Sequence, residues 1–314
     1  MQRRMMSGQT SGTIATDMPR PGKPVLMHRL LRWMAIGGVI LIGLVAVALF
    51  NNNFSLTHRS RVAFNAQLDA DLDHAIGWIA THPRDSETNP ALMYMISDME
   101  RMSGDTRLRT LLNDYAKHLS ASFDPLDSVW SRLANREAAV PMLSGADLRG
   151  AGFEQKWDAY GIAPNNVQLT TEGRADMFSP TKYYWGLRHH QLLALVIYRD
   201  FNGGSPDLDR TMSHLSEKIA RDAHYDFRVS DSYVQRTAFV LAAGRPDLIR
   251  DRWVERILDY QTSDGTWKYC WYGWCRGIFE FEMSSYSVHP TVQAAWALCM
   301  LKYRYPEWIN EHYR

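Results

Sequence analysis

The sequence predicts an all-α protein with one transmembrane helix near its N-terminus. Three observations support this fold class: an uncharged apolar run lies close to the N-terminus, apolar residues after it recur at helical spacing, and the alternation typical of strands is scarce. The chain has 314 residues, of which 46% are hydrophobic, so it can build a large core. Its formal net charge of +1 argues against a nucleic-acid partner, because binding a phosphate backbone requires a concentrated basic surface.

The apolar run extends from Trp33 to Phe50 and contains eighteen residues without a charge. A helix of this length crosses the hydrocarbon core of a lipid bilayer with its backbone polar groups satisfied internally. Six Lys and Arg residues precede the run and only Arg59 and Arg61 closely follow it, a bias that keeps the N-terminus in the cytoplasm. The alternative is a signal peptide that is cleaved near the small residues Ala46 and Ala48. We expect an inner-membrane protein of a bacterium with a cytoplasmic tail (1–30), a transmembrane helix (31–50), a spacer (51–60) and a periplasmic domain (61–314).

Helical spacing begins directly after the predicted spacer. The first helix ends before Pro83, the second has Asn89 as its N-cap with Pro90 at its first position and ends at Gly104, and the third begins with Asp105 as its cap. The buried faces of the first and third helices are predicted to be Phe64, Leu68, Leu72, Ala75, Ile76 and Ile79, and Leu108, Leu111, Leu112, Tyr115 and Leu119.

The middle of the chain has a different pattern. Residues 142–181 are rich in Gly and show no sustained period, which predicts an ordered but loop-rich segment. After it, Gln191, Gln235 and Gln293 each open an apolar helix that is followed by a short turn and a Pro-acidic-apolar start. This recurrence predicts helical hairpins that stack on one another.

Residues 257–267, ILDYQTSDGTW, resemble the Q-x-x-D-G-x-W element of α/α toroids such as terpenoid cyclases and protein prenyltransferases. The resemblance covers about residues 185–310. It implies an α/α-toroid-like domain, in which an outer ring of helices surrounds an inner ring, Gln261 and Trp267 join one helix end to the next, and a ligand cavity lies at one end. The chain lacks the Asp-x-Asp-Asp acid of squalene-type cyclases and the zinc-ligand spacing of prenyltransferases. The resemblance therefore implies no cofactor and no metal, and fold alone does not choose among the other toroids, which include glycoside hydrolases and polysaccharide lyases.

Aromatic residues are concentrated in the segment that follows this element. Aromatic rings with polar edges stack on sugar rings or hold apolar ligands, although the same side chains also cap helical cores. In an oxidising compartment Cys270 and Cys275 are expected to form a disulfide, with free thiols and a metal site as the alternatives, and Cys299 is expected to be a buried thiol. The predicted ligand-binding residues of this segment are Trp267, Tyr269, Trp271, Tyr272, Trp274 and Arg276.

Four residues are candidate general acids or bases. Glu280 and Glu282 alternate with Phe residues, so that both carboxyl groups of a short extended segment point the same way. His289 and His190 lie near the starts of two predicted inner helices, where they face the expected cavity. Carboxyl and imidazole groups perform general acid–base catalysis when their surroundings adjust their pKa values. The alternatives are solvent-exposed carboxylates, an ion pair with Arg276, and a capping role for His289.

A second cluster surrounds His190. Tyr184, Trp185 and Arg188 precede it, and Tyr233 lies near the start of the next predicted inner helix. Adjacent helical residues point about 100° apart, so that only one of His189 and His190 faces a cavity. Arg with Tyr or His is the combination that polysaccharide lyases use on uronates, which this cluster resembles in composition only.

Two functions follow from the sequence. The first is a membrane-anchored periplasmic protein that binds or processes an envelope glycan or a similar extended ligand, as a glycan-active hydrolase or lyase. The second is a non-catalytic envelope module that binds a glycan or a partner of a membrane complex.

Overall fold

The computed structural model describes residues 24–55, 59–87, 89–122, 124–182, 185–226, 229–267 and 288–314. Over these ranges the chain forms helices and no strand, and Leu143 and Val167 form an isolated β-bridge. The prediction of an all-α chain is confirmed. The chain divides into two compact units, Met1–Val47 and Ala48–Arg314, which are described separately.

Helix α1 (Pro24–Asn53) contains the predicted membrane-spanning segment. From Met27 to Asn53 it is long and apolar enough to cross a bilayer, and an 18-residue window within it has a mean hydropathy of 2.5. Its large apolar side chains are exposed, as the 71% exposure of Ile42 illustrates. The run is therefore not the core helix of a soluble domain, and burying these side chains in hydrocarbon removes their contact with water.

The first residues of the predicted spacer (51–60) are helical. Asn51, Asn52 and Asn53 complete the last turn of α1, and two of them are buried within the second unit. The side-chain amides of Asn52 and Asn53 donate to the carbonyls of Ala223 (3.0 Å) and His224 (2.8 Å). A polar sequence was mistaken for a linker because these amides are satisfied by helix-end carbonyls distant in sequence.

The first helices of the large unit agree with their sequence signals. Helices α2 (Arg61–Thr81), α4 (Pro90–Ser103) and α5 (Thr106–Ser120) bury the predicted apolar faces. Asn89 accepts from the amide of Ala91 at the start of α4, and Gly104 ends that helix at φ +67°.

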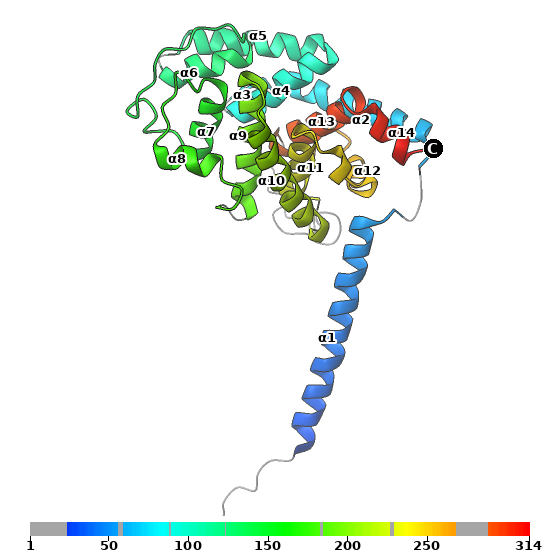
Figure 1. The fold of residues 1–314 in the computed structure, drawn as a ribbon. Coiled ribbons are helices and arrows are strands. Elements are labelled where there is room, and N and C mark those ends of the chain that lie inside the picture. The colour runs from blue at the N-terminus through cyan, green and yellow to red at the C-terminus, as the bar shows by residue number, and fades with distance from the viewer. Residues whose placement is uncertain are drawn as a thin grey trace, which may run out of the picture. The chain divides into compact units, whose positions relative to one another are not determined.

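Five helices form an inner ring. Helix α9 (Trp185–Asn202) packs between α7 (Phe153–Ile162) and α11 (Asp231–Ala242), α11 packs on α13 (Val288–Tyr303), and α13 packs on α4 (Figure 1). A thin contact between α4 and α7 closes the ring. The first and last inner helices in the sequence are thus neighbours in space.

Further helices cover the ring from outside. Helix α10 (Pro206–Tyr225) covers α9 and α11, α5 covers α4, α2 covers α13, and α12 (Asp251–Asp259) packs on α11 and α2. The remaining helices are short: α3 (Pro83–Glu87), α6 (Pro125–Trp130), α8 (Thr171–Met177), α14 (Pro306–His312) and the 3₁₀ turns Ser131–Leu133 and Pro246–Leu248. The segment 142–181, predicted to be loop-rich, contains α7 and α8, and that prediction was wrong for one inner helix.

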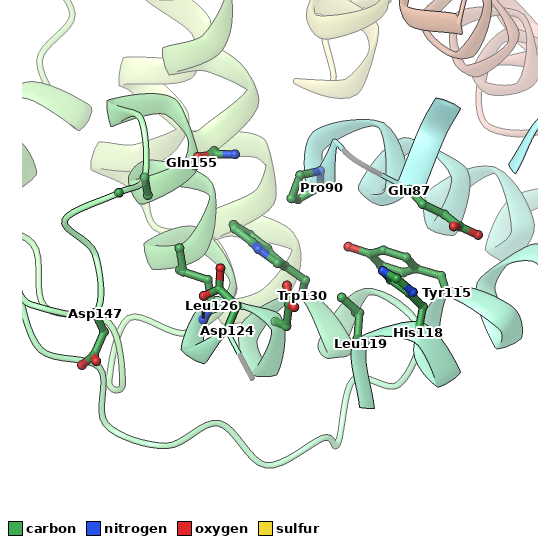
Figure 2. A pocket seen from close by; sticks show the side chains of 13 residues that line it. Glu87, Pro90, Tyr115, His118, Leu119, Asp124, Leu126, Trp130, Asp147 and Gln155 are labelled. Carbon is green, nitrogen blue, oxygen red and sulfur yellow. Dashed lines mark hydrogen bonds between the residues drawn. The ribbon is translucent and has the colours of Figure 1, made fainter. Parts of the chain in front are cut away.

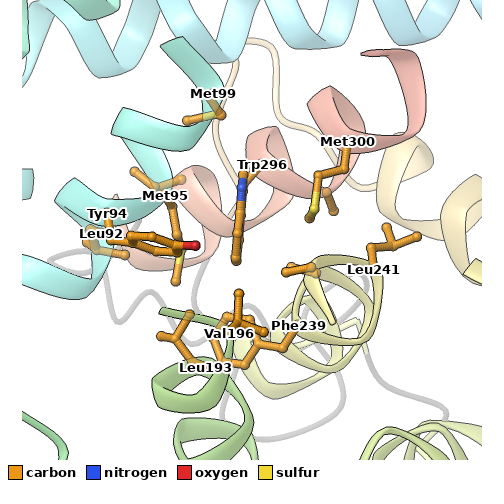
Figure 3. Packing of buried hydrophobic residues seen from close by; sticks show 14 of the residues in the cluster. Leu92, Tyr94, Met95, Met99, Leu193, Val196, Phe239, Leu241, Trp296 and Met300 are labelled. Carbon is orange, nitrogen blue, oxygen red and sulfur yellow. The ribbon is translucent and has the colours of Figure 1, made fainter. Parts of the chain in front are cut away.

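Side chains fill the centre of the ring (Figure 3). The indole of Trp296 makes edge contacts with Tyr94 (centroids 5.9 Å apart) and Phe239 (6.1 Å), and Met95, Leu193 and Val196 pack around them. At the end of the ring where α4, α9, α11 and α13 finish, polar links join the helices. Arg304 and Trp296 donate to Asp98, and Arg199 donates to the carbonyls of Ala242 and Ala243. The inner helices therefore begin together at the opposite end.

The Q-x-x-D-G-x-W element fixes the end of α12. The Gln261 amide donates to the carbonyls of Asp71 in α2 (2.7 Å) and Gly265 (3.2 Å), and the Trp267 indole donates to the Ile257 carbonyl (2.7 Å). Gly265 has φ +85°, and a Cβ there would lie 2.8 Å from the His74 carbonyl. Trp267 is 2% exposed, so it is a core residue, and its prediction as a ligand contact was wrong.

Candidate acid–base site

A cavity of about 310 Å³ opens where the inner helices begin. Its volume is at the lower end of the range of small-molecule pockets. The walls come from the starts of α4, α7, α9 and α13, with Phe239 of α11 at the base. The polar side chains that line it are Asn89, Glu154, Gln155, Asp158, His190, His289 and Gln293.

Asp158 is the buried acid of this cavity. Its residue is 6% exposed, and within the described part of the chain its carboxyl group accepts no hydrogen bond and forms no ion pair. Burial, and to a smaller extent the charge of Glu154, raises the pKa of Asp158 well above 3.8. The Asp158 carboxyl therefore keeps its proton at pH values where an exposed Asp loses it, as a general acid must.

Glu154 and His190 face each other across the same cavity. Glu154 lies one helical turn before Asp158 in α7, and its Oε1 is 3.6 Å from Nε2 of His190. Burial lowers the pKa of His190, and the nearby His289 adds to the lowering while Glu154 opposes it. The neutral imidazole is thus favoured beside a carboxylate.

His289 is oriented by a carboxylate from another inner helix. Its Nδ1 is 3.0 Å from Oδ1 of Asp231, and Oδ2 of Asp231 accepts from the Gln235 amide (3.0 Å). A carboxylate partner on Nδ1 favours the tautomer with its proton there, which leaves Nε2 as a proton acceptor. Asp231 is the first residue of α11, whose N-cap is Ser230.

Two predicted ligand contacts point away from the cavity. Tyr233 is fully buried, and its ring lies 5.4 Å from the Arg256 guanidinium. Arg188 forms an ion pair with Asp222 of α10 at 3.2 Å. Neither residue lines this cavity, because the side chains on this face of α9 and α11 pack against outer helices. His189 also lies on that face, where it accepts from Arg236, so the adjacent His190 is the one that lines the cavity.

The remaining predicted residues lie outside the described part of the chain. They are the candidate acids Glu280 and Glu282, the ligand contacts Tyr184, Tyr269, Trp271, Tyr272, Trp274 and Arg276, the cysteines Cys270 and Cys275, and the side chain of Trp185. The Cys299 thiol is buried, and burial raises its pKa to about 12.

Sequence reasoning missed Glu154 and Asp158. The available signal was the i, i+4 pair of carboxyl residues around Trp157, which places both on one face of any helix that forms there. Among the described residues, no three His, Cys, Asp or Glu side chains are grouped as metal ligands. The side chains that meet in the cavity support acid–base chemistry by their own titratable groups.

No family model, curated protein or solved structure matches the chain.

Proposed function

We propose that the protein is a membrane-anchored enzyme of the bacterial envelope that cleaves a glycan, or a similar extended ligand, by acid–base chemistry in the cavity at the starts of α4, α7, α9 and α13. In this proposal α1 anchors the chain in the inner membrane with its N-terminus in the cytoplasm, and the large unit lies in the periplasm. The Lys and Arg residues that precede α1 support this orientation. The ring of inner helices within outer helices supports membership of the α/α-toroid superfamily.

One observation supports catalysis more than any other. The cavity holds the Asp158 carboxyl group, whose pKa is raised, and two imidazoles: burial lowers the pKa of His190, and Asp231 holds Nδ1 of His289, so that a group that tends to keep its proton and groups that can accept one line the same space. An exposed Asp, with a pKa of about 3.9, has already lost its proton near pH 7. Titratable groups whose pKa values are displaced in this way are the usual sign of an acid and base pair.

The roles follow from the contacts. Asp158 donates its proton to the oxygen of the leaving group as the bond to that oxygen breaks. His289, held by Asp231 through Nδ1, accepts a proton at Nε2, either from the attacking water in a hydrolase or from the sugar carbon in a lyase. Glu154 stabilises positive charge that develops nearby, including on His190.

Turnover of glycans by the full-length protein in detergent tests the proposal. Purified protein is incubated with bacterial envelope polysaccharides, and new reducing ends and unsaturated products are measured. Asp158→Asn and His289→Gln should each lower the rate by a factor of about 10²–10⁴. The exposed changes Asp207→Asn and His214→Gln are the matched controls.

If these polysaccharides bind but neither the wild type nor the control variants release products, the protein is a binding module and the catalytic proposal fails. Unsaturated products would identify a lyase, and saturated products a hydrolase.

A further inference from the structure

A second hollow of about 380 Å³ adjoins the acid–base cavity. It lies beside α5, α6 and the segment that leads into α7 (Figure 2). Pro90 and Gln155 line both hollows. An extended ligand that occupies one hollow therefore has a neighbouring unit within reach of the other.

Carboxylates dominate this second hollow, which we term the acidic pocket. Glu87, Asp124, Asp127 and Asp147 line it, and none of the four forms an ion pair with a Lys or Arg in the described chain. His118 is the one lining side chain able to carry a positive charge.

Several carboxylates elsewhere in the large unit are paired with Arg side chains. Asp98 contacts Arg101 and Arg304, Asp200 contacts Arg101, and Asp226 contacts Arg236. Within the acidic pocket Asp124 accepts from the Leu126 amide, and Asp147 accepts from Ser144 and interacts with the charge of Arg149, so Glu87 and Asp127 are the two carboxylates that have neither a hydrogen bond nor an ion pair in the described chain.

Two buried side chains also present hydrogen-bond donors to the acidic pocket. Tyr115 is 1% exposed and Trp130 is 5% exposed, yet neither the Tyr115 hydroxyl nor the Trp130 indole N–H makes a hydrogen bond within the described chain. In Figure 2 the Tyr115 hydroxyl points toward the side of the pocket where Pro90 and Trp130 lie. Burial, with the charges of Asp127 and Glu87, raises the pKa of Tyr115, so the hydroxyl remains a donor. Both donor atoms are accessible at the pocket, so a ligand that supplies acceptors can take the place of water there.

We propose that the acidic pocket binds an amino sugar with a free amine, as one unit of a glycan whose neighbouring unit occupies the acid–base cavity. The ammonium group meets the unpaired carboxylates and the faces of the aromatic rings, and the sugar hydroxyls accept from Tyr115 and Trp130. This inference rests on the proposed function and names its substrate class, a glycan that is at least partly unacetylated.

Binding of defined oligomers to the full-length protein in detergent tests the inference. The probes are the glucosamine hexamer, the N-acetylglucosamine hexamer and hexalysine, measured by titration calorimetry at low salt. The glucosamine hexamer should bind most tightly, and the double variant Glu87→Gln, Asp127→Asn should weaken it about tenfold, since two partly exposed ion pairs are lost. Tyr115→Phe should weaken the same probe about fivefold, in line with a single hydrogen bond. Glu172→Gln with Asp207→Asn removes two exposed first-turn carboxylates elsewhere and should change nothing.

Two outcomes would overturn the inference. The N-acetylglucosamine hexamer should bind much more weakly than the glucosamine hexamer; if the two bind equally tightly, the pocket does not recognise the amine. If hexalysine binds equally well, the pocket recognises positive charge alone and not an amino sugar.

These failures are separable from failure of the proposed function. Turnover of a fully acetylated glycan that is lost in Asp158→Asn and unaffected by Glu87→Gln, Asp127→Asn leaves the enzyme in place and removes the amino-sugar pocket. If the glucosamine hexamer binds in a way that depends on Glu87 and Asp127, but no glycan is turned over, the amino-sugar pocket stands and the enzyme proposal fails.

Discussion

Replacing Asp158 by Asn is expected to stabilise the protein at neutral pH while removing the proton that the proposed reaction needs. Burial, followed by the charge of Glu154, raises the pKa of this carboxyl well above 3.8 in the folded protein. In the unfolded chain the carboxyl is in water, with a pKa of about 3.9. The folded state therefore holds the proton to a higher pH than the unfolded state does.

The sign and size of the effect follow from proton linkage. The stability associated with protonated Asp158 is fully present below about pH 4 and is lost as the pH rises toward the folded-state pKa. Within that window each pH unit lowers the free energy of unfolding of the wild type by about 1.4 kcal/mol. For a domain of this size that loss corresponds to roughly 3–6 °C in Tm. Asn does not titrate, so the Tm of Asp158→Asn should rise relative to the wild type by this amount for each pH unit.

Thermal unfolding followed by far-UV circular dichroism, at half-unit steps from pH 4 to pH 8, measures the difference. Titratable groups that do not interact with Asp158 cancel when the two proteins are compared at each pH, and the exposed change Asp207→Asn provides a flat reference. Parallel curves of Tm against pH for Asp158→Asn and the wild type would refute the argument that Asp158 is buried with a raised pKa.

Two further predictions concern the ring. Gly265→Ala should lower the free energy of unfolding by about 3 kcal/mol, because its Cβ would lie 2.8 Å from the His74 carbonyl. The control is Gly203→Ala, which has the same φ of +85° but open space around the Cβ and should lower the free energy of unfolding by only about 1–2 kcal/mol. Equal losses for the two variants in denaturant titrations would contradict the close approach at Gly265. Asp98→Ala should lower the free energy of unfolding by about 3 kcal/mol, since it leaves a buried indole N–H and two guanidinium groups without their shared carboxylate. The control is Asp200→Ala, at a more exposed carboxylate, measured in the same titrations. If Asp98→Ala loses no more stability than this control, Asp98 does not join α4 to α13.

The helices with complete local signals were predictable from the sequence. The start and end of α4 agree with Asn89, Pro90 and Gly104, and α2 buries the residues that its spacing indicates. Caps and apolar periodicity act over a few residues, so they can be read without the tertiary structure.

Helix α7 was missed because tertiary contacts decide it. It has ten residues, its buried side includes the carboxyl of Asp158, and Gly161 near its end reads as a loop signal. A Cβ on Gly161 would lie 3.1 Å from the Ala194 carbonyl, so the glycine permits α7 to approach α9 closely. The same residues that obscure the helix in the sequence place Asp158 at the cavity.

The candidate site was predictable only in part for a related reason. His190 and His289 were identified by their places near helix starts, and both line one cavity. The pairing of His289 with Asp231 joins residues from two helices, and no local pattern indicates such a contact. The opposite faces of α9 and α11, which hold Arg188 and Tyr233, are distinguished only by the outer helices that cover them.

The meeting of α13 with α4 makes the large unit circular in its connectivity. The backbone amide of Arg61 donates to the carbonyl of Arg314 (3.2 Å), and the rings of Phe64 and Tyr313 stack at 3.9 Å. A chain cut between α9 and α10, with residue 314 joined to residue 61, would therefore retain every neighbour in the ring. The packing of the ring therefore does not depend on which of its loops carries the chain ends.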